Sequence, residues 1–239
     1  MSSFHLALGE DFHVHSTFSD GASTLAENVQ TARERGLATL CLVDHVRRDT
    51  TWVPEFAAAV RPFRHHPELR VLAGVEAKIL DASGRLDVPP DLGRSEDIDL
   101  VLIADHQFPG QTGPVHPDRV RATIVNGGMT AAEAIEQLCR ATANALRPGA
   151  LLAHLFSLLP KIGLDEAMVP ARLLTELAGQ VADAGVLVEV NEKWSCPSAR
   201  TVTALADAGV SLVAGSDSHH RRDVGVYRSV RQTVSAAQA

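Results

Sequence analysis

The sequence has 239 residues, 45% of them hydrophobic, and a formal net charge of −7. This length allows two small domains or one α/β barrel, because such barrels run to roughly 250 residues as a single unit. No run of Lys or Arg is present, so a long nucleic acid or an anionic membrane is disfavoured as a partner. The composition favours a small, compact substrate.

The N-terminal stretch MSSFHLALGED lacks a charged region followed by an apolar core, and no apolar run approaches a membrane span of about 18 residues. We therefore expect a cytoplasmic protein without a membrane segment. The three cysteines, Cys41, Cys139 and Cys196, are far apart, which predicts neither a disulfide framework nor a CxxC metal site. The pattern does not distinguish a monomer from an oligomer.

Short apolar runs alternate along the chain with helical stretches, which is the pattern of βα units around a parallel sheet. Seven runs are predicted strands: 10–14, 38–44, 70–75, 99–104, 150–154, 186–190 and 211–215. Helices are predicted at 24–36 and 130–147, where Thr24 with Glu27 and Thr130 with Glu133 form capping boxes, and at 54–64, 165–184 and 197–208. With no linker in the sequence, we expect a single α/β domain over 1–239.

Residues 107–129 interrupt this alternation. The segment is rich in Pro and Gly and has little secondary-structure signal of its own. Loops of this length in compact domains are commonly functional. We predict that 107–129 is a lid insertion over the site.

Side chains that bind metals stand at the ends of six of the seven predicted strands. They are His13, His15, His45, Glu76, His106, His154, Asp217 and His219, and Asp20 in the first loop completes a set of nine. Because the carboxyl ends of parallel barrel strands converge on one face, these side chains are expected to meet there. We call these nine residues the ligand set.

The ligand set predicts a site for several metal ions. So many ionisable groups in one cleft are costly unless a cation neutralises them. The spacing of His13 and His15 places both rings on one side of a strand, and Asp217 with His219 repeats this spacing. Imidazole and carboxylate suit Zn, Fe and Mn, and nine ligands suffice for two to three divalent ions that share a carboxylate.

These residues resemble the motifs of the PHP superfamily, the polymerase and histidinol phosphatase group. The matching motifs are HVH, VDH, GVE, AH and SDSH, together with Asp20 and His106, and they span roughly residues 11 to 225. The resemblance implies a distorted, TIM-like (β/α)7 barrel with a trinuclear centre that hydrolyses phosphoesters.

The resemblance also implies how the ligand set is divided among the ions. One ion would be held by His13, His15, Glu76 and Asp217, a second by Glu76 with His106 and His154, and a third by Asp20, His45 and His219. The family's phosphatases often have His where Asp20 stands, so the donor at the third site differs. Asp20, Glu76, Asp217 and His219 are the predicted catalytic residues.

The predicted reaction is hydrolysis of a small phosphomonoester, either histidinol-phosphate-like or a nucleotide. Adjacent cations lower the pKa of a shared water, and the resulting hydroxide attacks phosphorus. Cationic donors are predicted for the phosphate oxygens: Lys78, Lys193, Arg221 and Arg222.

Three alternatives remain. The first is a phosphodiesterase or short-oligonucleotide exonuclease. The second is an amidohydrolase, disfavoured because that family typically has Lys where this chain has His106. The third is a non-enzymatic, metal-stabilised scaffold, disfavoured because all nine ligand positions are filled. Behind the ligand set, Glu189 and Asn191 are predicted to orient the imidazoles, and Asp44 and Asp105 to cap or pair with helices.

Overall fold

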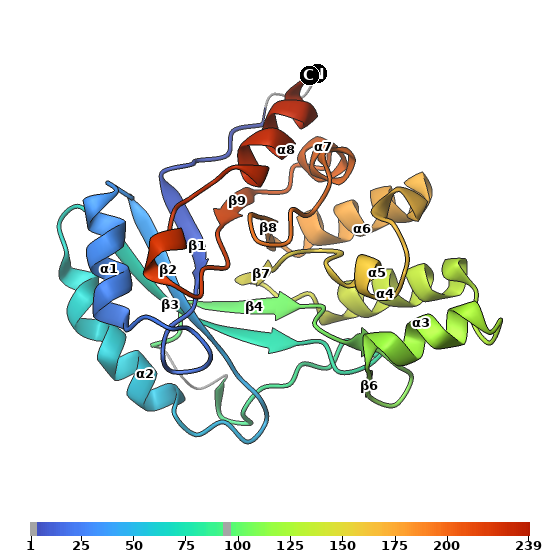
Figure 1. Ribbon diagram of the computed structural model, residues 1–239, viewed down its shortest axis with the longest axis horizontal. Coiled ribbons are helices and arrows are strands. Elements are labelled where there is room, and N and C mark those ends of the chain that lie inside the picture. The colour runs from blue at the N-terminus through green and yellow to red at the C-terminus, as the bar shows by residue number, and fades with distance from the viewer. Residues whose placement is uncertain (1–3, 93–96) are drawn as a thin grey trace.

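The computed structural model describes residues 4–92 and 97–239. Seven parallel strands form one sheet in the order β1-β2-β3-β4-β7-β8-β9. They are β1 Glu10–Val14, β2 Thr39–His45, β3 Arg70–Lys78, β4 Leu100–Ala104, β7 Ala150–Leu152, β8 Leu187–Asn191 and β9 Leu212–Gly215. Each strand lies on one of the seven predicted apolar runs. The sheet curls into a nearly closed barrel (Figure 1), which confirms the predicted TIM-like (β/α)7 fold.

The barrel closes where β1 meets β9, and the closure lies beside the ligand set. A single parallel bridge joins Val14 and Ser218. The backbone N–H of His15 donates to Ser218 O at 2.8 Å, and the N–H of Ser218 donates to His13 O at 3.2 Å. The backbone that carries the HVH motif is therefore fixed directly to the backbone of the SDSH motif.

Asp11 completes this closure below the bridge. Its Oδ1 accepts from the backbone N–H of Ser216 at 2.9 Å, and its Oδ2 accepts from Gly225 N–H at 2.7 Å. The side chain is fully buried, and this burial raises its pKa to about 6. The carboxylate thus takes the place of backbone acceptors where β1 and β9 do not pair.

Helices cover the outside of the sheet (Figure 1). They are α1 Leu25–Glu34, α2 Val53–Val60 with the 3-10 turn Arg61–His65, α4 Ala131–Ala145, α6 Ala171–Asp183, α7 Ala199–Asp207 and α8 Ser229–Gln238. Both predicted capping boxes are present, at Thr24 and at Thr130. The helix predicted from 165 begins later, because Pro170 is the N-cap of α6 and the residues before it form a 3-10 turn. Helix α8 was not predicted.

The segment 107–129 has more regular structure than its composition indicates. Two short strands, β5 Phe108–Pro109 and β6 Pro114–Val115, form a hairpin, and α3 Pro117–Val125 follows. A Pro at the first helical position fits a helix start, because its missing N–H has no partner there anyway.

The barrel interior below the ligand set is apolar. Cys41 and Val43 of β2 pack with Leu72 of β3, Leu102 of β4 and Leu151 of β7. Strand alternation gives Cys41 and Val43 the same inward face as His45. The same strands therefore fill the barrel bottom with hydrocarbon and bring imidazole and carboxylate to its open end.

Candidate metal centre

Glu76, at the inward face of β3, is the centre of the ligand set. Its side chain is 1% exposed, and five imidazoles surround its two oxygens. The Oε1 atom lies 2.9 Å from His154 Nε2 and 3.0 Å from His106 Nε2, and the Oε2 atom lies 2.8 Å from His45 Nδ1 and 3.5 Å from Nε2 of both His13 and His15. The Glu76 carboxylate therefore lies among five imidazoles at the centre of the cluster, and its sharing between ions stays a prediction.

The other two carboxylates extend the cluster toward the opening of the barrel. Asp20 Oδ2 lies 3.4 Å from His45 Nε2 and 3.3 Å from His219 Nε2. Asp217 Oδ1 lies 3.4 Å from His15 Nε2 and 3.4 Å from His219 Nδ1. The structure thus brings all nine residues of the ligand set together.

Three groups within the described residues have donor atoms close enough to share an ion. They are His15, Asp20, His45 and His219; His13, His15 and Glu76; and His45, Glu76 and His106. His15 and His45 each belong to two groups, whereas the resemblance gave each of them to one ion. The division of the ligand set among individual ions stays a prediction.

The protonation pattern of the cluster fits bound cations. Glu189 Oε1 lies 3.0 Å from His13 Nδ1, so a neutral His13 ring with its proton on Nδ1 would present the lone pair of Nε2 to an ion. That lone pair faces Nε2 of His15 at 3.0 Å. In the described part of the chain, buried His15 Nδ1 and Glu76 Oε2 also lack a hydrogen bond of acceptable geometry. Divalent metal ions would satisfy these inward-facing donors.

Burial and neighbouring charges together shift the pKa values of His13 and His15 in opposite directions. Burial lowers the pKa of His13, but the negative charges of Glu189, Glu76 and Asp217 outweigh burial and hold that pKa well above its usual range. Burial also lowers the pKa of His15, to about 4 despite the hydrogen bond with Asp217. Without a cation, the two rings would therefore adopt different protonation states.

Glu189 and Asp105 orient the ligand imidazoles from behind. Glu189 contacts His13 as described above, and its Oε2 accepts from the backbone N–H of His154 at 2.7 Å. Asp105 accepts from Ser157 Oγ at 2.8 Å and from Leu158 N–H at 3.2 Å, and its Oδ1 lies 3.4 Å from His154 Nδ1. The contact with His13 confirms the predicted role of Glu189. The contact with Leu158, which begins helix α5 Leu158–Lys161, confirms the predicted helix cap by Asp105, whose contact with His154 was not predicted.

Asp44 and Asn191 support loops. Asp44 Oδ1 accepts from the backbone N–H groups of Ser16 and Ser19, both at 3.1 Å, and so fixes the loop that carries Asp20. Asn191 Oδ1 accepts from Trp194 N–H at 2.8 Å. Asn191 therefore positions the loop after β8, and contact with a ligand imidazole was the wrong prediction for it.

Gly215→Ala is expected to weaken metal binding without touching a ligand. A Cβ at position 215 would lie 2.6 Å from Glu189 Cδ, so the Glu189 carboxylate would be pushed away from His13 and His154. Loss of such a supporting contact typically lowers metal affinity about 10- to 100-fold. Metal titration would measure the change. Gly179→Ala in α6, where a Cβ meets open space, is the matched control; equal affinity in both variants would contradict the role of Glu189.

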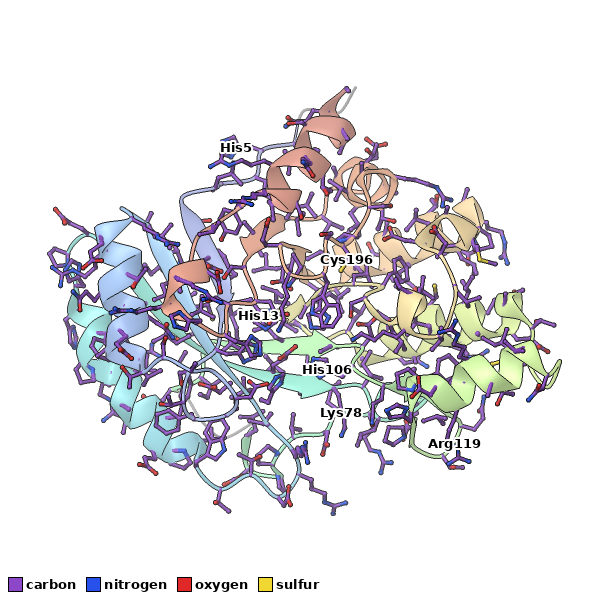
Figure 2. The ribbon with its side chains drawn as sticks, in the orientation of Figure 1. His5, His13, Lys78, His106, Arg119 and Cys196 are labelled. Atoms are coloured by element: carbon purple, nitrogen blue, oxygen red, sulfur yellow. The ribbon has the colours of Figure 1, made fainter. Side chains whose placement is uncertain are left out.

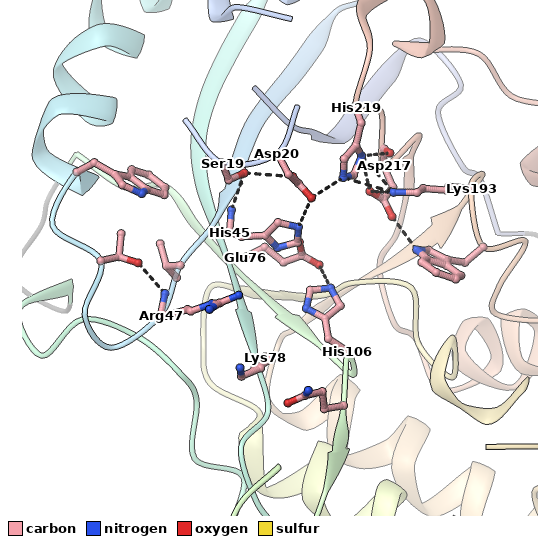
Figure 3. A pocket seen from close by; sticks show the side chains of 15 residues that line it. Ser19, Asp20, His45, Arg47, Glu76, Lys78, His106, Lys193, Asp217 and His219 are labelled. Carbon is pink, nitrogen blue, oxygen red and sulfur yellow. Dashed lines mark hydrogen bonds and ion pairs between the residues drawn. The ribbon is translucent and has the colours of Figure 1, made fainter. Parts of the chain in front are cut away.

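The ligand set opens into a pocket of about 700 Å³, which Figure 3 shows from close by. Its predicted lining residues are Asp20, His45, Glu76, Lys78, His106, Lys193, Asp217 and His219, and the lining residues not predicted are Ser19, Val46, Arg47, Thr50, Trp52, Gln107 and Trp194. Arg47 had a readable signal, because it stands two residues after His45 and so shares its face in a continued strand. His13, His15 and His154 lie beneath the pocket.

The loop after β8 brings a cation to the ligand set. Lys193 Nζ lies 3.3 Å from Asp217 Oδ1 and 3.1 Å from His219 Nδ1. Trp194 Nε1 donates to Asp217 Oδ2 at 2.8 Å, and Lys161 Nζ lies 3.8 Å from the centre of the Trp194 ring. Trp194 thus fixes the orientation of a ligand carboxylate at the pocket wall.

The family model of the PHP domain matches residues 11–193. The chain belongs to the PHP domain family. The matched stretch of this PHP domain contains the whole ligand set except Asp217 and His219.

Curated relatives and one solved structure are similar to this chain. A probable phosphatase of Vibrio parahaemolyticus is 30% identical over 128 residues, 51% of this chain and 50% of that protein. A probable phosphatase of Caldanaerobacter subterraneus is 32% identical over 113 residues, 43% of this chain and 42% of that protein. The chain spans about half the length, or less, of the curated relatives it matches. Histidinol phosphate phosphatase of Lactococcus lactis, solved with zinc, L-histidinol and phosphate, superposes with a TM-score of 0.70 at 16% identity over 98% of this chain and 94% of that chain.

Two predicted phosphate-binding residues of this PHP domain lie outside the pocket. Arg221 and Arg222 belong to the 3-10 turn Arg221–Asp223, and both are exposed. The chain turns away from the pocket after His219, so nearness in sequence does not bring these side chains to the ligand set.

The lid predicted at 107–129 has little contact with the pocket. Gln107 is the member of this segment that lines it. Figure 2 shows Arg119 on α3 at the periphery, away from His13, His106 and Lys78 near the middle of the view. The lid role stays a prediction.

Among the described residues, no helix is long and apolar enough to cross a membrane.

Proposed function

We propose that this PHP domain is a metal-dependent phosphoesterase that hydrolyses a small phosphomonoester, either histidinol-phosphate-like or a nucleotide. The observation that carries the proposal is the convergence of the nine side chains of the ligand set, with Glu76 at their centre, at the floor of an open pocket. The volume of about 700 Å³ suits a small metabolite. The names of the similar proteins, probable phosphatase and histidinol phosphate phosphatase, support the same reaction.

The ligand set would hold two to three divalent ions of zinc, iron or manganese. Ions bound there supply a Lewis acid that activates water and neutralises phosphate charge. The predicted catalytic residues would hold these ions at the pocket floor. They are Asp20, Glu76, Asp217 and His219. With an ion bound, Glu189 would hold the proton of His13 on Nδ1, so that Nε2 is available as a ligand.

Lys193 is the cation best placed for the phosphate of the substrate. Its side chain is 43% exposed and lines the pocket within 3.3 Å of Asp217. The ammonium group has three N–H donors, and a phosphate seated at the ligand set would accept from it.

The proposal is tested by elemental analysis of the purified protein and by phosphate release from a panel of phosphomonoesters on the same sample. We expect two to three ions per chain and release from at least one ester, abolished by a chelator and restored by metal. Full metal content without release from any monoester would overturn the phosphomonoesterase and favour a diesterase or a scaffold.

Lys193→Ala is expected to lower kcat/KM by about 10- to 100-fold, the scale of one lost charge-assisted hydrogen bond. Steady-state kinetics on the best ester of the panel would measure the loss, with metal content determined in parallel. Lys161→Ala is the matched control, because Lys161 contacts the Trp194 ring and does not line the pocket. Equal losses in the two variants would argue against phosphate binding by Lys193.

A further inference from the structure

A second layer of charge lies just outside the ligand set, at the C-terminal ends of strands β2 and β3. His45 pairs with Glu76 in the parallel register of these strands. The backbone N–H of Val46 donates to Glu76 O at 2.9 Å, so the register continues past the end of β2. This register places Arg47 beside Lys78. Both residues lie two positions beyond a member of the ligand set, His45 or Glu76, and so share its face.

Both cations line the pocket and face it together. Figure 3 shows the guanidinium of Arg47 and the ammonium of Lys78 on one side of the ligand cluster. Arg47 lies two positions after His45, and Lys78 lies two positions after Glu76. Two positions along a strand correspond to roughly 7 Å. A phosphate at the ligand set would therefore leave these cations free for a group a few carbon atoms away.

Arg47 is held in place and yet has unused donors. Its backbone N–H donates to Thr50 Oγ1 at 2.8 Å, and Thr50 N–H donates back to Arg47 O at 3.1 Å. This turn fixes where the side chain starts. Within residues 4–92 and 97–239, the guanidinium makes no hydrogen bond or ion pair, so its five N–H donors are available at the pocket wall.

Lys78 keeps donors free although it has an ionic partner. Its Nζ lies 3.2 Å from Asp87 Oδ2, while Asp87 Oδ1 accepts from the backbone N–H of Arg48 at 2.8 Å. The pair uses one of three N–H donors and holds the ammonium at the wall. Two donors remain for a ligand.

We propose that Arg47 and Lys78 form a subsite for a second anionic group, a carboxylate or a second phosphate, on the same substrate molecule. The inference rests on the proposed phosphoesterase and narrows its substrates to phosphomonoesters that carry another negative charge. It therefore favours a nucleotide with a second phosphate over a histidinol-phosphate-like ester, whose remaining groups are not anionic. A guanidinium fork binds either group in a bidentate manner, and the adjacent ammonium adds a point charge.

The test compares matched esters on the metal-loaded protein. 3-Phosphoglycerate differs from glycerol 3-phosphate by a carboxylate in place of a hydroxymethyl group, and fructose 1,6-bisphosphate differs from fructose 6-phosphate by a second phosphate. We expect kcat/KM to favour the more anionic ester by about tenfold or more in at least one pair, and the pair that responds names the group. Arg47→Gln and Lys78→Met should each bring that ratio close to one.

Arg48→Ala is the matched control. Arg48 is the next residue, is also exposed and lines a neighbouring pocket instead. In Arg48→Ala, the ratio of kcat/KM between the two esters of a pair should equal that of the unmutated protein. A ratio near one in the unmutated protein, or equal losses on both esters in Arg47→Gln, would overturn the subsite while leaving the phosphoesterase intact.

Calorimetric measurement of ester binding distinguishes failure of the proposed phosphoesterase from failure of the proposed subsite. If the metal-loaded protein releases phosphate from no ester, the phosphoesterase is wrong. Tighter binding of 3-phosphoglycerate than of glycerol 3-phosphate, lost in Arg47→Gln, would still support the anion subsite. Equal binding in both pairs would overturn the subsite as well.

Discussion

Glu76→Gln is expected to remove at least one metal ion per chain and to lower kcat on the order of 10³-fold, the scale of one lost electrostatic stabiliser in an active site. Five imidazole nitrogens lie between 2.8 and 3.5 Å from the two carboxylate oxygens of this residue. An amide keeps the shape, but it removes the negative charge and turns one oxygen into a donor. Elemental analysis and phosphate release on one sample would measure both effects.

The control for this variant is Glu55→Gln on the exposed face of α2, which removes the same charge far from the ligand set. Unchanged metal content in Glu76→Gln would mean that the carboxylate is only a structural partner of the imidazoles. Reduced metal content with unchanged turnover would mean that the ion it holds is not needed for the reaction.

Removal of metal is expected to lower the melting temperature by roughly 5–10 °C. An ion at a free concentration of 100 times its Kd stabilises the folded state by about 2.7 kcal/mol, and each kcal/mol moves Tm by about 2–4 °C in a domain of this size. The ligand set is costly without ions, because His13, His15 and Glu76 are buried together.

Thermal melts with a chelator, followed by addition of zinc, manganese or iron, would measure this shift. The metal that restores the largest part of Tm at equal concentration is the one that the ligand set prefers. A melting temperature insensitive to chelation at full metal loss would show that hydrogen bonds such as that between His13 and Glu189 suffice to stabilise the empty cluster.

The strands and the convergence of the ligand set were predictable for physical reasons. Strands covered on both faces appear as continuous apolar runs, and a residue that ends such a strand lies at the open end of the barrel. The supporting role of Glu189 followed from the same rule. These inferences need only the position of a residue along its strand.

The remaining features depend on information that is not local. His15 and His45 each offer two nitrogens to a crowded cluster, so the sequence does not divide them among ions. The position of Arg47 beside Lys78 depends on the register between β2 and β3. Arg221 follows His219 closely, but the direction of the turn between them is set by tertiary packing.

The closure between β1 and β9 has a consequence for biosynthesis. His13 lies near the beginning of the chain and Asp217 near its end, and the backbone of the HVH motif meets its partner Ser218 only when β9 is in place. Contacts of such sequence separation form late, because they close the longest loop. A nascent chain therefore displays the HVH histidines long before it can complete the cluster, and full metal loading has to follow synthesis of the last strand.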